Sequence, residues 1–249
     1  MEYFLAQLRL EHLPPSLYPD LLKKKILVRP FIPGKMLKSK RIDLRLLKDF
    51  AMMRNALASR NFFDKNNIFG LKNYALKDSG FYRKELINNF KFAPKKFREL
   101  ERFGLWIVND FLEIFEHIKK SQKEIVEDYS KMPFEKQHQD FREDNILVTP
   151  KGQMLIDWGS SYGYGPFMND VAPFLVNNEK AFKAYTRTDN ICKNSTGEEI
   201  KRWLYLGLAV RFLELLRWRL EPNEKRADTK KHCKNFLEYE YETFKWLLK

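Results

Sequence analysis

The chain has 249 residues, of which 44% are hydrophobic, and its formal net charge is +13 at pH 7. This composition excludes an intrinsically disordered chain and allows one large domain or two small ones with a packed core. The sequence shows no run of about eighteen apolar residues and no signal peptide, so neither a transmembrane helix nor secretion is expected. Two cysteines are too few for a disulfide framework. We therefore expect a soluble protein of the cytoplasm.

The positive charge is unevenly distributed along the chain. A basic protein often binds nucleic acid, anionic lipid or phosphorylated molecules, but a lysine-rich surface that keeps the protein soluble is the simpler explanation. We therefore do not expect nucleic acid as the partner, and an anionic membrane surface stays open as an alternative. Residues 131–180 contain five basic and seven acidic side chains. Because clustered carboxylates repel one another unless a cation lies among them, this segment favours a metal site.

In chain order, the first predicted elements are a helix at residues 1–10 and a strand at 25–31, followed by a turn at Ile32–Lys35. Helical spacing of apolar side chains then recurs in five longer stretches. These stretches span residues 43–60, 81–89, 94–131, 200–220 and 230–249. Gly104 lies in the longest of them and is expected to let another helix pack closely. Residues 159–166 are predicted to form a loop.

The most informative stretch lies between residues 138 and 158. Two short apolar runs, Ile146–Val148 and Met154–Ile156, are joined by a turn that contains a proline and a glycine, which predicts a β-hairpin. Such a hairpin places Asn145 at the start of one strand and Asp157 at the end of the other. Both side chains are then expected at the same open end, close enough to share a cation.

These side chains suit phosphoryl transfer. In that reaction the protein holds Mg²⁺ on the phosphates and orients the attacking hydroxyl. Mg²⁺ takes one or two carboxylate or amide oxygens and keeps water and phosphate for the rest of its shell, so Asn145 and Asp157 are its predicted ligands. Asp140, on the preceding loop, is the predicted acceptor of the hydroxyl proton. Arg142 follows two residues later and is predicted to face the transferring phosphate.

The order and spacing of these residues resemble the aminoglycoside phosphotransferase and choline kinase family of protein-kinase-like enzymes. The matching residues are His138-x-Asp140-x-x-x-x-Asn145-Ile146-Leu147, Ile156-Asp157-Trp158, Gly165-Pro166 and Asp170-Val171-Ala172. The resemblance implies that Asp140 is the catalytic base and that Asn145 and Asp157 are metal ligands. It also implies that His138 is a buried brace, and that Asp170 steadies the loop and starts a helix.

The same resemblance implies an α+β, protein-kinase-like fold, mainly the helical C-terminal lobe with a short catalytic hairpin. Residues 1–37 would be a remnant of the N-terminal lobe with the connector between lobes, and residues 38–249 the C-terminal lobe with a helical substrate subdomain. By this resemblance the carbonyl of Pro30 and the N–H of Ile32 would meet the adenine edge of ATP. An ordinary edge strand and turn is the alternative for that segment.

Two features depart from the family pattern. Gln139 stands where the family has glycine, which matters if that backbone needs a positive φ. No glycine precedes Gly34, so the Gly-rich phosphate loop and the strand lysine of the family are not found before the connector. Three explanations compete: the sequence is part of a longer protein, the N-terminal lobe is reduced, or the protein does not catalyse.

The sequence thus predicts an ATP- and Mg²⁺-dependent phosphotransferase that acts on a hydroxyl of a small molecule. The acceptor classes that fit are an amino alcohol, a sugar, an aminoglycoside-like compound or a lipid head group. The alternatives are a catalytically inactive kinase-like binding module and a fragment of a longer kinase. The sequence does not determine the acceptor or the oligomeric state.

Overall fold

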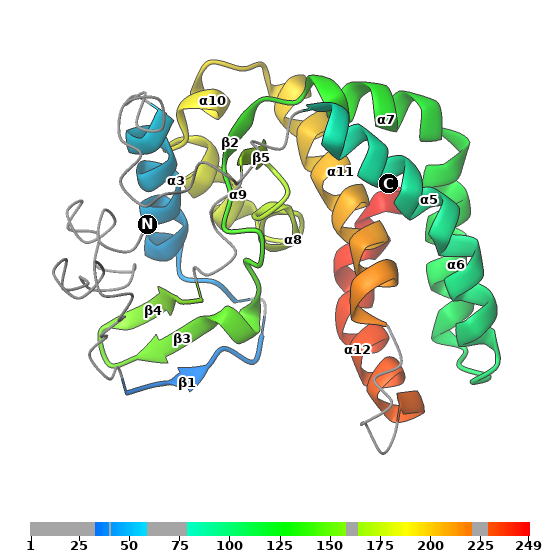
Figure 1. Ribbon diagram of the computed structural model, residues 1–249. Helices are drawn as coiled ribbons and strands as arrows, with labels where there is room; N and C mark the ends of the chain where they lie inside the picture. Colours follow the sequence, from blue (N-terminus) through cyan, green and yellow to red (C-terminus); the bar gives the residue numbers. More distant parts are fainter. Residues whose placement is uncertain (1–32, 40, 59–78, 158–163, 221–228) are drawn as a thin grey trace, which may run out of the picture.

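Two small antiparallel sheets and a large helical body make up the fold (Figure 1). The computed structural model describes residues 33–39, 41–58, 79–157, 164–220 and 229–249. Within these ranges the fold is α+β, as the sequence predicts. The helix predicted at residues 1–10 and the strand predicted at 25–31 lie outside the described residues.

The first sheet contains the predicted hairpin. Strands β3 (Ile146–Thr149) and β4 (Gly152–Leu155) are antiparallel, with Ile146 opposite Leu155. Both of these side chains are fully buried, which fixes the register of the hairpin because a shift by one residue would expose them. Strand β1 (Lys35–Met36) pairs with the other edge of β3, so the strand order is β1-β3-β4.

The second sheet was not predicted. Strand β2 (Phe134–Lys136) pairs with β5 (Tyr164–Pro166), which lies inside the segment predicted to be a loop. The prediction of a loop is wrong for β5 because a three-residue strand carries no period of its own. Its pairing partner lies about thirty residues earlier in the chain, and a local pattern cannot show such a pairing.

The helices surround these sheets unequally. Their bounds are α3 (Leu44–Ala58), α5 (Ser79–Glu101), α6 (Ile107–Lys120), α7 (Gln122–Lys131), α8 (Ala172–Leu175), α9 (Glu179–Thr186), α10 (Asn190–Lys193), α11 (Gly197–Glu214) and α12 (Thr229–Phe244). The five-residue π-helix η3 (Leu215–Arg219) continues α11, and short 3-10 turns occur at η1 (Glu143–Asn145) and η4 (Lys245–Leu248). No helix of the described ranges combines the length and the apolar character that crossing a membrane requires.

Figure 1 shows α5, α6, α7, α11 and α12 side by side as one helical body, with α3 and the hairpin sheet on the opposite side of the molecule. Aromatic rings join the helices of the body. Phe111 of α6 stacks on Phe212 of α11 at 5.7 Å between centroids, and Phe212 meets Phe244 of α12 edge-on at 5.4 Å. Helix α11 begins at Gly197, shortly before the stretch predicted at residues 200–220, and Thr196 and Glu199 form a capping box there.

The long helical stretch differs from its prediction in two places. Pro94 lies inside α5 instead of starting a helix, and it is exposed while its neighbours Ala93 and Phe97 are buried. Burial of the apolar face offsets the cost of a proline in the helix interior, about 3 kcal/mol. Gly104 has φ +61° with open space around it, so it forms the turn between α5 and α6 and does not mediate close packing.

A buried ion pair ties α3 to the strand that precedes the loop of the predicted motif. Arg54 of α3 lies 2.7 Å from the carboxylate of Glu135 in β2, and both side chains are buried. Arg54 also donates to the Tyr185 hydroxyl of α9 and, at 2.7 Å, to the carbonyl oxygen of Phe167. Charged side chains are rarely buried unless they are paired in this way. These contacts of Arg54 fix the point at which the chain leaves β2 and enters the loop that follows.

Candidate active site

One buried carboxylate holds the loop between β2 and β3. Asp170 is 1% exposed and accepts two backbone hydrogen bonds, from the N–H of His138 at 2.6 Å and from the N–H of Gln139 at 3.0 Å. Hydrogen bonds to an ionised carboxylate are about twice as strong as neutral ones. The predicted role in steadying the loop agrees with this geometry. The predicted helix start does not, because both oxygens are committed to the loop and α8 begins after Val171 without a side-chain cap.

His138 occupies the position of the predicted buried brace. Its ring is fully buried, and its Nε2 lies 2.9 Å from the carbonyl oxygen of Ile156. Burial lowers the pKa of His138, although the carboxylates of Asp170, Asp140 and Asp157 act in the opposite direction. The imidazole therefore connects the loop to the end of the hairpin as a neutral group near neutral pH.

Asp140 and Asn145 are joined directly. The amide nitrogen of Asn145 donates to the backbone carbonyl oxygen of Asp140 at 2.8 Å and to the Asp140 carboxylate at 2.9 Å. Asn145 is 6% exposed, so its amide is held in place within the loop. Because its nitrogen is used by Asp140, the side-chain oxygen of Asn145 is the atom that can bind a cation.

Asp157 lies at the open end of the hairpin, as predicted. The N–H of Ile156 donates to the carbonyl oxygen of Asn145 at 2.8 Å, which places Asp157 one residue beyond that pair. The carboxylate is exposed, and its backbone has φ +57°, a left-handed conformation that is uncommon for aspartate. Strained backbone of this kind is concentrated at functional sites, where the surrounding structure maintains it.

The donor set at the hairpin mouth fits Mg²⁺. An amide oxygen from Asn145 and a carboxylate from Asp157 are hard oxygen ligands, and Mg²⁺ commonly takes one or two of these and fills its shell with water and phosphate. The described part of the chain contains no group of three or more His, Cys, Asp or Glu side chains that could hold a metal by themselves. A cation at this position would need further oxygens, from water or phosphate, to complete its shell.

Arg142 pairs with carboxylates of its own loop. Its Nε lies 3.2 Å from Asp140, and its terminal nitrogen lies 3.0 Å from Asp144. All three side chains are partly accessible to solvent. This geometry orients the Asp140 carboxylate, and whether Arg142 also faces a phosphate stays a prediction.

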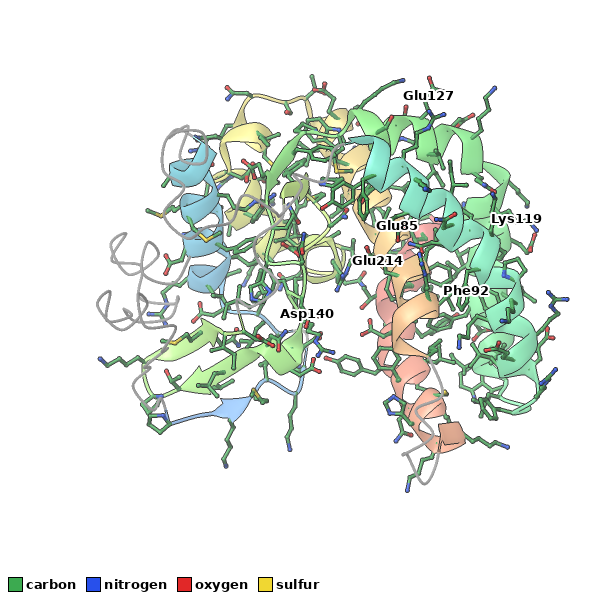
Figure 2. The ribbon with its side chains drawn as sticks, in the orientation of Figure 1. Glu85, Phe92, Lys119, Glu127, Asp140 and Glu214 are labelled. Atoms are coloured by element: carbon green, nitrogen blue, oxygen red, sulfur yellow. The ribbon has the colours of Figure 1, made fainter. Side chains whose placement is uncertain are left out.

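A cavity of about 710 Å³ opens beside Asp140, between the loop and the helical body. Seven carboxylates line it, against three basic side chains, Lys38, Arg142 and Arg211. The carboxylates are those of Glu85, Asp140, Glu143, Asp144, Asp170, Glu214 and Glu240. Figure 2 shows Glu85 of α5 and Glu214 of α11 close together, with Asp140 on the loop beside the hairpin. Aromatic rings complete the wall, among them Phe81, Tyr82, Phe236 and Tyr239.

Burial and nearby carboxylates shift the pKa values of two groups on the cavity wall. Burial raises the pKa of Tyr82, and Asp170 and Glu214 raise it further. Burial works against the charged form of Arg211, yet Glu214 and other carboxylates raise the pKa of this guanidinium. Arg211 lies 2.9 Å from Glu214, so that carboxylate is partly neutralised. The rise for Arg211 shows that the nearby carboxylates outweigh the effect of its burial.

A sequence model of the phosphotransferase enzyme family matches residues 12–191, well over half of the chain. The chain belongs to this family. Among solved structures, a choline kinase from Cryptosporidium parvum Iowa II superposes with a TM-score of 0.48 at 12% identity, over 99% of this chain and 75% of its own. A Plasmodium vivax ethanolamine kinase gives a TM-score of 0.46 at 16% identity over 88% of this chain, which spans 64% of that kinase. No curated protein sequence matches significantly.

Membership of the phosphotransferase family confirms the resemblance seen in the motif and the protein-kinase-like character of the fold. Two predicted contacts with the nucleotide, Pro30 and Ile32, lie outside the described residues and stay predictions. The helical wall of the cavity was not predicted from the sequence. Glu85 and Glu214 are more than fifty residues from the motif on either side, and no local spacing connects them to it.

Proposed function

We propose that this member of the phosphotransferase family transfers the γ-phosphate of ATP, with Mg²⁺, to a hydroxyl group of a small cationic molecule. One observation carries the proposal: the hairpin begins at the hydrogen-bonded pair of Asp140 and Asn145 and ends at Asp157, and a cavity of about 710 Å³ opens beside Asp140. Phosphoryl transfer needs little more from a protein than positioned oxygens, a metal ion and an oriented hydroxyl.

Each residue has a defined part in this proposal. The carboxylate of Asp140, held by the Asn145 amide and the Arg142 guanidinium, accepts the proton of the acceptor hydroxyl. Asn145 and Asp157 would hold the Mg²⁺ ion, which supplies charge neutralisation on the phosphates when it is bound. Arg142 keeps the carboxylate of Asp140 turned toward the cavity side of the loop. Asp170 and His138 hold the loop in the conformation that this requires.

The charge of the cavity selects among the acceptor classes. Seven carboxylates outnumber three basic side chains on its wall, and aromatic rings lie among them. An ammonium group gains from both features, through Coulomb attraction and cation–π contact. An amino alcohol or an aminoglycoside-like compound therefore fits better than a neutral sugar or an anionic lipid head group.

A direct assay tests the proposal. ATP consumption is measured with Mg²⁺ against ethanolamine, choline, kanamycin, glucose and glycerol phosphate. We expect turnover with at least one of the cationic acceptors. The Asp140→Asn variant should lose about a hundredfold to ten-thousandfold in kcat, because the acceptor hydroxyl then has no base. Equal turnover by Asp140→Asn and the parent would refute the assigned base.

Ligand-linked stabilisation, read together with turnover, separates the proposed enzyme from a binding module of kinase ancestry. MgATP should raise the melting temperature of the parent and of Asp140→Asn, and Asp157→Ala should lose most of that rise. Stabilisation by MgATP without turnover of any acceptor would favour the binding module. Absence of both effects would contradict both candidates.

A further inference from the structure

Gln139 adopts a backbone conformation that normally belongs to glycine. Its φ is +68°, and apart from Asp157 no other non-glycine residue of the described ranges has a positive φ. Left-handed backbone is disfavoured for residues with a Cβ, and a glycine here would be free of that strain. Asp170 maintains the conformation by accepting the Gln139 N–H at 3.0 Å and that of His138 at 2.6 Å. The loop therefore retains a strained side chain next to Asp140.

The side chain of Gln139 reaches into the cavity. It lines the wall beside Asp140 and forms a hydrogen bond with the hydroxyl of Tyr82 on α5. Tyr82 is itself fixed, since its ring meets Phe81 and Phe134 edge-on at 5.5 Å and 5.4 Å between centroids. The rigid side chain of Tyr82 therefore restricts the Gln139 amide to one rotamer.

Gly165 of β5 leaves space for the Tyr82 hydroxyl that bonds to Gln139. A Cβ placed on Gly165 would lie only 2.7 Å from the Tyr82 hydroxyl and 3.1 Å from Gln137 Cγ. Glycine at that position of β5 leaves the room that the hydroxyl occupies. A strained glutamine, a half-buried tyrosine of α5 and a glycine of β5 therefore form one local structure that holds an amide group beside Asp140.

We propose that Gln139 is a specificity-determining residue that contacts the acceptor next to the hydroxyl that is phosphorylated. The proposal rests on the proposed function, because it needs an acceptor in the cavity. An amide that donates to Tyr82 keeps its carbonyl oxygen free, and the partial negative charge of this oxygen attracts a cationic group of the acceptor. An ammonium group beside the reactive hydroxyl is the cation that the acidic cavity favours.

A purely structural role is the alternative and is testable: Gln139 would only brace Tyr82 and α5. In that case removing the Tyr82 hydroxyl would reproduce every effect of changing Gln139. If Gln139 contacts the acceptor, the two changes differ, because Tyr82→Phe leaves the amide next to Asp140 and Gln139→Gly removes it. Tyr82→Phe is therefore the matched control.

The probes are choline and its uncharged carbon isostere, dimethylbutanol, which share a shape and a hydroxyl and differ in charge. Acceptor KM is measured by turnover, and binding of each probe is measured independently by titration calorimetry. Gln139→Glu adds a negative charge at the same length, and we expect it to lower the KM for choline about tenfold and to leave that for the isostere unchanged. Gln139→Gly should raise the KM for choline several-fold while the melting temperature rises, since the strain is removed.

The possible results distinguish a failure of the role proposed for Gln139 from a failure of the proposed function. Turnover of choline with the same ratio of KM values in Gln139→Glu as in the parent would overturn the inference alone. The inference also fails, and the function stands, if Tyr82→Phe reproduces the changes seen in Gln139→Gly. Absence of turnover and of binding for choline, ethanolamine and kanamycin alike in the parent would overturn the cationic acceptor, and the inference with it.

Discussion

Asp140 is held from two sides, by the amide of Asn145 at 2.9 Å and by the guanidinium of Arg142 at 3.2 Å. Each donor restricts the rotation of the carboxylate, so its oxygens keep one orientation relative to the cavity. Pre-set geometry of this kind is a large part of what a protein contributes to phosphoryl transfer. In the proposed reaction Arg142 therefore acts mainly through Asp140.

At the same scale, His138 should make stability depend on pH. Burial lowers its pKa below the ordinary 6.5, so near neutral pH the ring is uncharged in both the folded and the unfolded chain. As the pH falls through 6.5, the unfolded chain takes up a proton first. The contribution of His138 to stability is thus fully present above that pH and is lost below it, with a limiting slope of about 1.4 kcal/mol per pH unit.

Urea unfolding of the parent between about pH 5 and pH 8 measures this slope, a window that brackets the ordinary histidine pKa. His138→Gln should flatten it, since glutamine does not titrate. His117→Gln, at an exposed histidine of α6, serves as the control and should retain the slope of the parent. An unchanged slope in His138→Gln would show that other groups cause the acid sensitivity.

At the scale of elements, the buried pair of Arg54 and Glu135 joins α3 to β2. Arg54→Met should destabilise the fold by about 3–5 kcal/mol, because it leaves a buried carboxylate without its cation. Replacing both residues, as Arg54→Met with Glu135→Leu, should recover much of that loss, since neither member of the pair is then left buried without its partner. Chemical denaturation gives both free energies of unfolding.

An exposed pair provides the comparison. Lys119 and Glu116 of α6 lie 3.1 Å apart but are 46% and 52% exposed, and Lys119 is marked in Figure 2. Lys119→Met should cost about 1 kcal/mol or less, because solvent screens the pair. A cost for Arg54→Met as small as that for Lys119→Met would mean that water reaches Glu135, and the role given to the pair would be wrong.

Local patterns in the sequence predict those elements whose cause is local. The hairpin follows from two apolar runs around a Pro-Gly turn, and the start of α11 follows from the capping box of Thr196 and Glu199. Strand β5 has no such signal, because only its pairing with β2 makes it a strand. Pro94 misleads for the opposite reason: its local preference is overridden by the buried face of α5.

At the scale of the whole molecule, the site also has one part that local sequence patterns predict and one part that they do not. The motif from His138 to Asp157 is contiguous, so its three oxygen-bearing side chains are visible in the sequence. The cavity that would take the acceptor is built from residues as distant as Leu37 and Phe244. Only the tertiary fold brings these segments together, which is why the sequence left the acceptor undetermined and the cavity charge favours a cationic one.

The contrast between a chain of net charge +13 and an acidic cavity predicts a dependence on salt. An ammonium group inside the cavity meets seven carboxylates and three basic side chains on the wall, while salt at 0.1 M screens exposed charges that lie more than about 10 Å away. The local attraction dominates, so the KM for choline should rise several-fold as salt increases. The uncharged isostere should show no such rise, and an equal response of both compounds would contradict the electrostatic assignment.

The two left-handed residues of the loop region, Gln139 and Asp157, bear on how this protein would change under selection. Each such conformation costs roughly 1–2 kcal/mol, and glycine at position 139 avoids that cost without opening a void. A laboratory screen for heat resistance alone should therefore recover Gln139→Gly early. Variants selected in this way would have higher thermal stability and lower specificity for the acceptor. A screen that aims to keep the natural reaction must therefore also measure which alcohol is consumed.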